Sequence, residues 1–306
     1  MFIKKILKKI VSSKFFLNYP KGRRYIFLFH DVSDENEKHH SDIYSTSIKQ
    51  FKKNISLINN FFHIIPLDEL VSNNHLDNKN YASITFDDGF FSVLKNAYPV
   101  LSKLNIPFTI FVNGEAIKNN QLWVSNLILN KDQNYHKKLS NLTQVKYLHN
   151  KSVQSIYSNG FFDKKFCKVY KFANRDKKIY LNFEDIVFLV SKSVNIESHS
   201  FHHLVLSKCE KNLLDSEILD NKTFLANINK KDSLHFAIPF GKQNHYNESV
   251  IKKIRSFGYK YIYTTEANYF NKSNLNDENY LFPRITITNQ STSELMYSIN
   301  RPLFFR

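Results

Sequence analysis

The sequence predicts an α/β fold built on a parallel sheet or barrel, and three observations lead to this prediction. Short apolar runs alternate with segments whose apolar residues recur at helical spacing, as in βαβ units. The first run, YIFLF at residues 25–29, is apolar throughout, as expected for a strand buried on both faces. Apolar residues form 42% of the 306 residues, which is enough for a large core and excludes a disordered or collagen-like chain.

The predicted elements alternate along the chain. Short apolar runs predict strands at residues 25–29, 63–67, 82–86, 107–112, 194–197, 234–238, 260–264 and 281–288. Apolar residues at helical spacing predict helices at residues 48–58, 90–104, 207–229 and 247–257. Gly258 follows the last helix, where a glycine commonly ends a helix in the left-handed conformation.

One long stretch breaks this alternation. Residues 115–183 show no clear strand pattern, contain the single Trp, Trp123, and are too long for a structureless loop in a compact domain. We interpret them as a mostly helical insertion, which either shapes access to a barrel mouth or is a surface elaboration without a catalytic role. Residues 21–306 are predicted to form one domain that contains this insertion.

Residues 1–20 are predicted to be a distinct basic segment. The first 16 residues, MFIKKILKKIVSSKFF, combine an apolar helical period with lysines at positions 4, 5, 8, 9 and 14. The pattern is typical of an interfacial amphipathic helix on anionic lipid, and equally of a helix docked on the protein's own surface. The segment lacks the features of a secretory signal, and no run of 18 apolar residues could span a bilayer. We therefore expect a cytoplasmic protein, or one bound peripherally to the inner membrane face through residues 1–24.

The net charge of +16 suggests a polyanionic partner, but composition explains it more simply. Lysine is spread along the whole chain, only seven of the 43 basic residues are arginine, and no nucleic-acid-binding motif is present, so we expect no nucleic-acid partner. The two cysteines, Cys167 and Cys209, form no CxxC pair, which excludes a disulfide scaffold and a cysteine-based zinc site.

Two adjacent carboxylates, Asp87 and Asp88, directly follow a predicted strand in ITFDDG at residues 84–89. Uncompensated charge is costly at such a position. The two side chains point to different sides of the chain, so one could bind a metal ion while the other accepts a proton. The alternative for this fragment is an ordinary Asp-Gly turn with solvated acids.

Three histidines lie within five positions after another predicted strand, in HSFHH at residues 199–203. His199 and His203 are four apart, close enough to reach one ion if the segment turns helically. Two histidines and one carboxylate, with a position left for water, form the ligand set of a catalytic zinc site. Histidines without a metal role remain the alternative.

Three more fragments lie at predicted strand ends. His30 follows the first strand, and histidine is well suited to proton transfer near neutral pH. The segment PFG at residues 239–241 predicts a tight turn, which could direct backbone N–H groups at a ligand or be a turn only. Arg284 begins the last strand and, if buried rather than exposed, needs a carboxylate partner, for which Asp87 is the best candidate. Active sites of α/β barrels are built at the carboxyl ends of strands, so this convergence predicts a catalytic site.

Together, TFDDG at residues 85–89, HSxxH at 199–203 and FAxPFG at 236–241 resemble the motifs of the polysaccharide deacetylase (NodB homology) family, carbohydrate esterase family 4. The first two motifs are specific and the third is supportive. The resemblance covers roughly residues 25–290, apart from the insertion. It implies a distorted, incomplete (β/α)7-type barrel and a metal-dependent hydrolase that removes acetyl groups from a glycan, most simply by cleaving the carbon–nitrogen bond of an N-acetyl group.

The resemblance also implies a role for each matching residue. Asp87 would be the general base. The metal ligands would be Asp88, His199 and His203. The ion would be a single divalent one, zinc in the first place, with cobalt, nickel or manganese also fitting the donor set. The turn that holds the substrate and the oxyanion would be formed by Pro239, Phe240 and Gly241, with the backbone N–H of Phe240 as the donor.

The chain departs from the usual family pattern in three places. A Leu-x-His motif normally near the C-terminus is absent there, whereas LFH occurs at residues 28–30. This order is similar to that of circularly permuted members, such as the deacetylases of biofilm poly-N-acetylglucosamine, so His30 would be the general acid. Ala237 stands where many members have an arginine that orients the base, a role that Arg284 could take from another strand. Phe240 replaces a common tyrosine, which removes a hydroxyl contact to the substrate.

Other functions use the same residues. A non-catalytic glycan-binding relative would keep the fold, although the full Asp/Asp/His/His set argues against it, and a different metal hydrolase or isomerase would act on another bond. We expect an N-acetylated glycan or a lipid-linked saccharide of surface-polysaccharide metabolism as the substrate. Chitin oligomers, peptidoglycan, poly-N-acetylglucosamine and acetylated xylan fit the motifs equally.

Overall fold

The computed structural model describes residues 11–13, 21–37, 39, 41, 43–124, 178–229 and 232–304. The N-terminal segment predicted over residues 1–20 lies outside the described residues except at 11–13. Most of the insertion predicted over residues 115–183 lies outside them as well.

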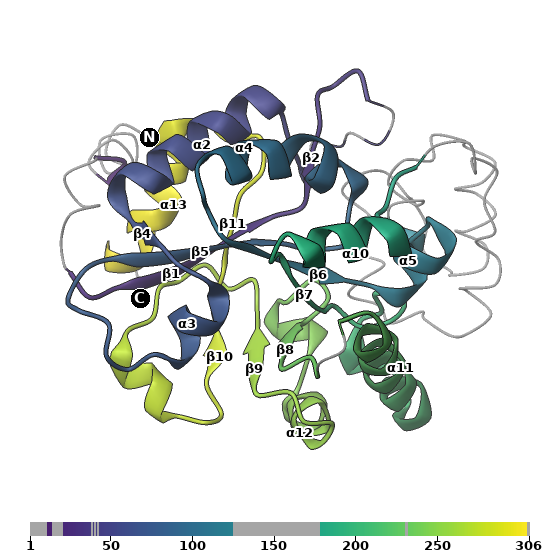
Figure 1. Cartoon of the computed structure of the whole chain (residues 1–306). Helices are drawn as coiled ribbons and strands as arrows, with labels where there is room; N and C mark the ends of the chain where they lie inside the picture. Colours follow the sequence, from purple (N-terminus) through teal and green to yellow (C-terminus); the bar gives the residue numbers. More distant parts are fainter. Residues whose placement is uncertain are drawn as a thin grey trace, which may run out of the picture.

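A parallel sheet is the framework of the described chain (Figure 1). Its strands are β1 (Arg24–Phe29), β4 (His63–Ile64), β5 (Tyr81–Phe86), β6 (Phe108–Val112), β7 (Asn195–Ser198), β8 (His235–Ala237), β9 (Tyr261–Tyr263), β10 (Leu281–Phe282) and β11 (Ile285–Thr286). The order across the sheet is β10-β9-β8-β7-β6-β5-β1-β11, and β4 pairs with β5 off this path. A separate two-stranded sheet pairs β2 (Asp31–Val32) with β3 (Ser45–Thr46).

The sheet curves into an open half-barrel, which confirms the predicted incomplete (β/α) barrel. Strands β10 and β11 lie at opposite ends of the strand order, yet only Pro283 and Arg284 separate them in the chain. Because the three Cα–Cα steps from Phe282 to Ile285 span at most about 11 Å, the two ends of the sheet must approach each other. Arg284 therefore lies where the barrel fails to close.

The apolar runs are explained by burial on both faces of the sheet. All six residues of β1 are buried: Tyr25, Phe27 and Phe29 pack under the outer helices, while Ile26 faces the barrel interior. The interior cluster also contains Phe111 of β6. Strands covered on both sides have no solvent face, so they show no polar alternation.

Helices cover the outside of the sheet, and α2, α4 and α13 lie on one side of β1 and β5 (Figure 1). Their bounds are α2 (Ile48–Phe61), α4 (Tyr98–Lys103), α5 (Gly114–Asn119), α10 (Phe183–Ser191), α11 (Lys211–Asn229), α12 (Glu248–Ser256) and α13 (Thr292–Phe304). Shorter turns are η2 (Val93–Ala97, a π-helix), η3 (Leu206–Lys208), η4 (Gln243–His245) and η5 (Lys272–Asn276). No helix in the described ranges has the length and apolar character needed to cross a membrane.

Prolines account for three differences from the predicted elements. The helix predicted over 90–104 is a π-helical turn followed by α4, because Pro99 in the first turn of α4 has no N–H for the normal hydrogen bond. The strand predicted over 63–67 ends at Ile64, since Pro66 caps the helix α3 (Leu67–Ser72). The strand predicted over 281–288 is two strands, divided at Pro283, that pair with different neighbours.

Helix α3 was not predicted, and it closes the amino end of the barrel. Its apolar residues Leu67, Leu70 and Val71 belong to the interior cluster. At the start of β1, the Arg24 guanidinium donates to the carbonyl oxygen of Leu70 at 2.6 Å. The opposite end, where the strands finish, is left for polar side chains.

Candidate active site

The carboxyl ends of the strands bring the sequence-predicted residues together. His30 follows β1, the acidic pair follows β5, and the histidine segment follows β7. The turn at residues 239–241 follows β8, and Arg284 comes from the segment between β10 and β11. These positions are far apart in the chain, and only the parallel arrangement of the strands brings them to one face.

Asp87 and Arg284 form a buried bidentate ion pair. The two terminal guanidinium nitrogens donate to the two carboxylate oxygens, each at 2.7 Å. Nε of Arg284 donates to the carbonyl oxygen of Thr264 at 3.1 Å, so three hydrogen bonds fix the orientation of the guanidinium group. Burial raises the pKa of Asp87, but the charge of Arg284, followed by a smaller electrostatic interaction with His199, outweighs burial and lowers the pKa to about 2. Asp87 is therefore an oriented, ionised carboxylate at neutral pH.

Asp88, His199 and His203 form the group that could hold a metal ion. One ligand atom from each lies within 4.8 Å of the others, and all three residues are buried. Oδ1 of Asp88 is 3.5 Å from Nε2 of His199 and 3.2 Å from Nε2 of His203. Ligand atoms about 2.0–2.1 Å from a tetrahedral zinc ion lie roughly 3.3 Å apart. The three donors therefore fit the ligand set of such an ion.

The hydrogen bonds of these three residues favour the same interpretation. Nδ1 of His199 donates to the carbonyl oxygen of Ala237 at 2.8 Å, which leaves Nε2 unprotonated toward Asp88. Oδ1 of Asp88 is buried and accepts no hydrogen bond. Burial and the charge of Asp87 raise the pKa of Asp88 well above its usual value, and burial and His199 lower the pKa of His203 well below its usual value. A cation between them would offset the cost of burying that carboxylate.

The backbone is strained at this site. Seven non-glycine residues of the described chain have φ in the left-handed region, and four of them lie in the site segments. The four are Asp88, Ser200, His203 and Phe240. Such conformations cost about 1–3 kcal/mol each and cluster at functional sites.

His30 interacts electrostatically with Asp87, Arg284 and His199. Burial lowers its pKa to about 4, while the charge of Asp87 acts in the opposite direction. Its Nδ1 is buried and has no hydrogen-bond partner. His30 is therefore neutral at rest, with one ring nitrogen uncommitted.

Phe240 belongs to an aromatic group beside the histidines. Its ring centroid lies 4.5 Å from that of His203 and 6.2 Å from that of Trp123. Nε1 of Trp123 donates to the carbonyl oxygen of His203 at 3.1 Å. Sequence reasoning placed Trp123 in the insertion without a role, and its being the single Trp was the only signal.

Two buried asparagines were also missed by sequence reasoning. Nδ2 of Asn113 donates to the carbonyl oxygens of His199 and Ser200. Asn221 on α11 donates to the carbonyl oxygen of Val112 at 3.0 Å and accepts from the N–H of Gly114 at 2.8 Å. A polar residue on the apolar face of a predicted helix is the signal that could have identified Asn221.

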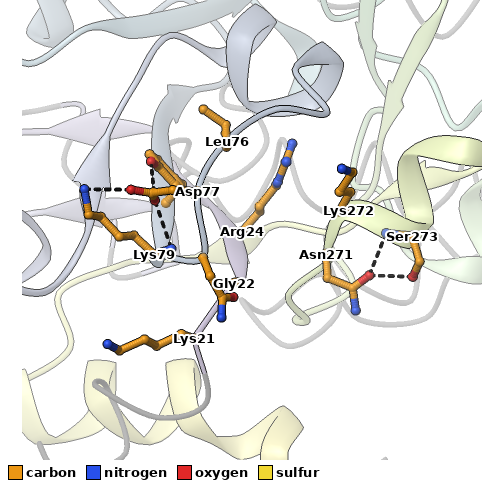
Figure 2. A pocket seen from close by; sticks show the side chains of 11 residues that line it. Lys21, Gly22, Arg24, Leu76, Asp77, Lys79, Asn271, Lys272 and Ser273 are labelled. Atoms are coloured by element: carbon orange, nitrogen blue, oxygen red, sulfur yellow. Dashed lines mark hydrogen bonds and ion pairs between the residues drawn. The ribbon is translucent and has the colours of Figure 1, made fainter.

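A pocket of about 380 Å³ lies at the other end of the barrel, at the start of β1 and β5 (Figure 2). Its basic residues are Lys21, Arg24, Lys79 and Lys272. Arg24 already donates to two carbonyl oxygens at the C-terminal end of α3, and Lys79 pairs with Asp77 at 2.7 Å. The pocket contains none of the predicted site residues, so we assign it no catalytic role.

Comparisons with known proteins agree with the motifs. The family model described as polysaccharide deacetylase matches residues 75–262. The YxkH protein of Bacillus subtilis (strain 168), whose name places it among the polysaccharide deacetylases, is 24% identical over 183 residues. That alignment covers 60% of this chain but only 44% of YxkH, so the match spans less than half of the relative.

Solved structures share the fold. The deacetylase PplD of Streptococcus pyogenes, in complex with acetate, has a TM-score of 0.61 at 16% identity, with 92% of this chain and 99% of PplD covered. IcaB from Ammonifex degensii also has a TM-score of 0.61 at 16% identity, with 91% of this chain and 97% of IcaB covered.

Proposed function

Because the chain belongs to the polysaccharide deacetylase family, we propose that it hydrolyses acetyl groups, most simply N-acetyl groups, on a glycan or lipid-linked saccharide with one divalent metal ion. The observation that carries this proposal is the buried Asp88–His199–His203 group beside the Asp87–Arg284 pair. The three donors would provide a site for the metal ion, and the carboxylate held by arginine would provide a general base. Metal-assisted hydrolysis requires both.

Asp88, His199 and His203 would hold the ion. The bound ion would lower the pKa of a water molecule and polarise the acetyl carbonyl. Zinc is the first candidate for one carboxylate and two imidazoles, and cobalt, nickel or manganese would also fit.

Asp87 would act as the general base and accept the proton of the attacking water. The two hydrogen bonds from Arg284 orient its carboxylate, which supports the proposal that Arg284 replaces the arginine missing at Ala237. The same pairing keeps the pKa of Asp87 low, so the carboxylate is ionised before the reaction and releases the proton readily afterwards.

His30 would be the general acid that protonates the leaving nitrogen. Its lowered pKa means that it is neutral at rest, so it has to gain a proton during the reaction cycle, and the proton that Asp87 takes from the attacking water would supply it. The negative charge of Asp87 favours that protonated form. The backbone N–H of Phe240, in the turn fixed by Pro239 and Gly241, would help to hold the developing oxyanion.

The proposal also covers partners and location. We treat residues 21–306 as the deacetylase domain and residues 1–20 as an attached basic segment. Of residues 1–24, which were expected to bind an anionic membrane surface, Arg23 and Arg24 are buried in the fold. Residues 1–21 would therefore bind this surface from the cytoplasmic side, where lysine-rich segments interact with anionic lipids. A membrane-bound enzyme suits a lipid-linked or membrane-proximal glycan as substrate.

The experiment that tests this function measures acetate release from a panel of N-acetylated glycans with zinc-loaded protein. Asp87→Asn should abolish turnover while the metal content stays at about one ion per chain, and His199→Ala should lose the metal. Asp77→Asn, which removes an acid near the distant pocket, is the charge-matched control and should remain active.

Full turnover of Asp87→Asn at saturating metal would refute the assignment of the base. Absence of bound metal after reloading with zinc or cobalt would refute the hydrolase mechanism. Glycan binding without acetate release by the metal-loaded protein would indicate the non-catalytic alternative.

A further inference from the structure

The segment that carries His199 and His203 is held at its ends by Asn113 and Trp123, and in its middle by one buried acid, Glu217. We propose that Glu217 on α11 is a positioning residue that fixes this segment and thereby sets the affinity of the site for its ion. This inference rests on the proposed metal-dependent function.

Glu217 makes three contacts with the middle of the segment. Oε2 accepts the backbone N–H of His202 at 2.9 Å, and Oε1 lies 2.6 Å from Nδ1 of the same residue. The backbone carbonyl of Glu217 accepts the N–H of Phe201 at 2.9 Å. Glu217 is fully buried and is not one of the three candidate metal donors, so it acts through the segment and not on the ion.

The segment needs such support because its backbone is strained at both ends of this contact. Ser200 and His203 are both in the left-handed region, with φ of 62° and 59°. This conformation persists in non-glycine residues only where the surroundings fix it. Within the segment, Oγ of Ser200 accepts the N–H of His203 at 3.1 Å. The N–H of Glu115 on α5 donates to the carbonyl oxygen of Phe201 at 3.0 Å, whereas the N–H groups of residues 201 and 202 both bond to Glu217 on α11.

Helix α11 is itself fixed to the sheet next to Glu217. Asn221 lies one turn further along the helix and is fully buried. It donates to Oγ of Ser198 at 2.8 Å and to the carbonyl oxygen of Val112 at 3.0 Å. Glu217 and Asn221 therefore face the same strand ends, and the position of the carboxylate is set by β6 and β7, the strands next to the site.

A carboxylate is an expensive choice for this position if its only role is packing. A buried acid is costly unless its oxygens are bonded, whereas an apolar side chain of similar size would fill the same space. The two oxygens of Glu217 bond to one residue, His202, which directly precedes His203. Orientation of that ligand is the function that a carboxylate adds here.

The test compares the affinity for zinc in four variants of the full chain, by competition with a chromogenic chelator. Glu217→Gln and His202→Leu should each bind zinc about tenfold more weakly, the lower end of the effect of removing groups that orient metal ligands. His202→Asn keeps an N–H donor near the place of Nδ1 and should bind nearly as tightly as the wild type. Asp220→Asn, an exposed acid on the same helix, removes the charge without a contact and should not change the affinity.

A second readout separates positioning from stability. The visible spectrum of the cobalt-loaded protein reports the ligand geometry, and it should change in Glu217→Gln and His202→Leu but not in the two control variants. Lower thermal stability with unchanged zinc affinity and unchanged cobalt spectrum would overturn the proposal. If Glu217→Gln does not fold, the comparison of His202→Leu with His202→Asn tests the proposal alone. Both variants should fold, because the His202 side chain is 32% exposed.

Failure of this inference differs from failure of the proposed function. A wild-type chain that binds no zinc or cobalt contradicts the metal-dependent function itself. A wild type that binds zinc, with Glu217→Gln and His202→Leu indistinguishable from it, contradicts only the role of Glu217.

Discussion

At the scale of single residues, the Asp87–Arg284 pair shows how the chain combines a charge with an orientation. Arg284 comes from the short connection between the two edges of the sheet and reaches Asp87 at the end of β5. A planar guanidinium fixes both oxygens of the carboxylate, which a lysine ammonium does not do. The geometry of the pair, and not its charge alone, should therefore matter for turnover.

Arg284→Lys tests this distinction because it keeps the positive charge but removes the pair of parallel hydrogen bonds that the guanidinium donates to Asp87. We expect the turnover number for acetate release to fall about 100-fold, a typical cost of misplacing a reacting group by about 1 Å. Zinc content should stay unchanged, since Arg284 donates to Asp87 and not to the three candidate metal ligands. Arg23→Lys, at a buried arginine at the start of the sheet, is the matched control and should keep normal turnover. Normal turnover of Arg284→Lys would show that charge alone is sufficient.

His245 makes stability depend on pH. Burial, and then the charge of Lys242, lowers its pKa to about 4, and its Nδ1 accepts the N–H of Lys242 at 3.0 Å. Between about pH 6.5 and 4 the unfolded chain takes up a proton that the folded chain does not, so the free energy of unfolding falls as the pH falls.

The expected loss from His245 is at most about 3.5 kcal/mol over this interval, from about 1.4 kcal/mol per pH unit. His245→Gln keeps an acceptor but does not titrate, so its free energy of unfolding should depend less steeply on pH. Urea unfolding at several pH values measures the difference between the two proteins. His63→Gln, at an exposed histidine, is the matched control for the substitution itself. Equal slopes for wild type and His245→Gln would contradict the assignment.

At the scale of elements, the strand-end turns were easier to predict than the elements around them. The DDG and PFG turns follow buried strands and contain residues whose chemistry marks them. Helix α3 has only six residues and no such mark, and its place inside the barrel depends on contacts with residues distant in sequence. The division of the last strand was missed because both halves are apolar, and only pairing with different neighbours separates them.

The turn at Gly241 gives a prediction at this scale. Gly241 has φ of 63°, and a Cβ there would lie 2.7 Å from the backbone nitrogen of Thr265. Gly241→Ala should therefore lower the free energy of unfolding by about 2 kcal/mol or more, and should reduce activity by moving Phe240.

Gly258→Ala is the matched control for this substitution. Gly258 also has a positive φ, of 86°, but its nearest neighbour is the flexible end of Lys222. Gly258→Ala should lower the free energy of unfolding by about 1–2 kcal/mol, from the backbone conformation alone, and should leave turnover unchanged. Equal effects of the two substitutions on stability and turnover would show that the close approach at Gly241 is unimportant. Chemical denaturation and acetate release measure the two effects.

At the scale of the whole molecule, the candidate site could be predicted because a parallel sheet places all its carboxyl ends on one face. The strand ends at residues 30, 87–88 and 199–203 were identified from residue types and from the alternation of elements. The supporting residues Asn113, Glu217 and Asn221 were not, because most of their partners are backbone groups, and because the fold alone brings the side chains of His202 and Ser198 to Glu217 and Asn221. The positions of Glu217 and Asn221 follow from the packing of α11 against the ends of β6 and β7, and Asn113 directly follows β6.

The N-terminal segment gives the last prediction, since the described part of it contacts the protein. The buried Asn300 of α13 donates to the carbonyl oxygens of Val11 and Ser13 at 2.8 and 3.1 Å. Deleting residues 1–10 removes four lysines but keeps this contact, so binding to anionic vesicles at low salt should be lost while the thermal stability is unchanged. Deleting residues 1–20 should in addition cost about 1–3 kcal/mol, because the Asn300 amide loses its acceptors. Vesicle binding that survives the shorter deletion would show that residues 1–10 are not the membrane anchor, and would favour docking of this part of the segment on the protein surface.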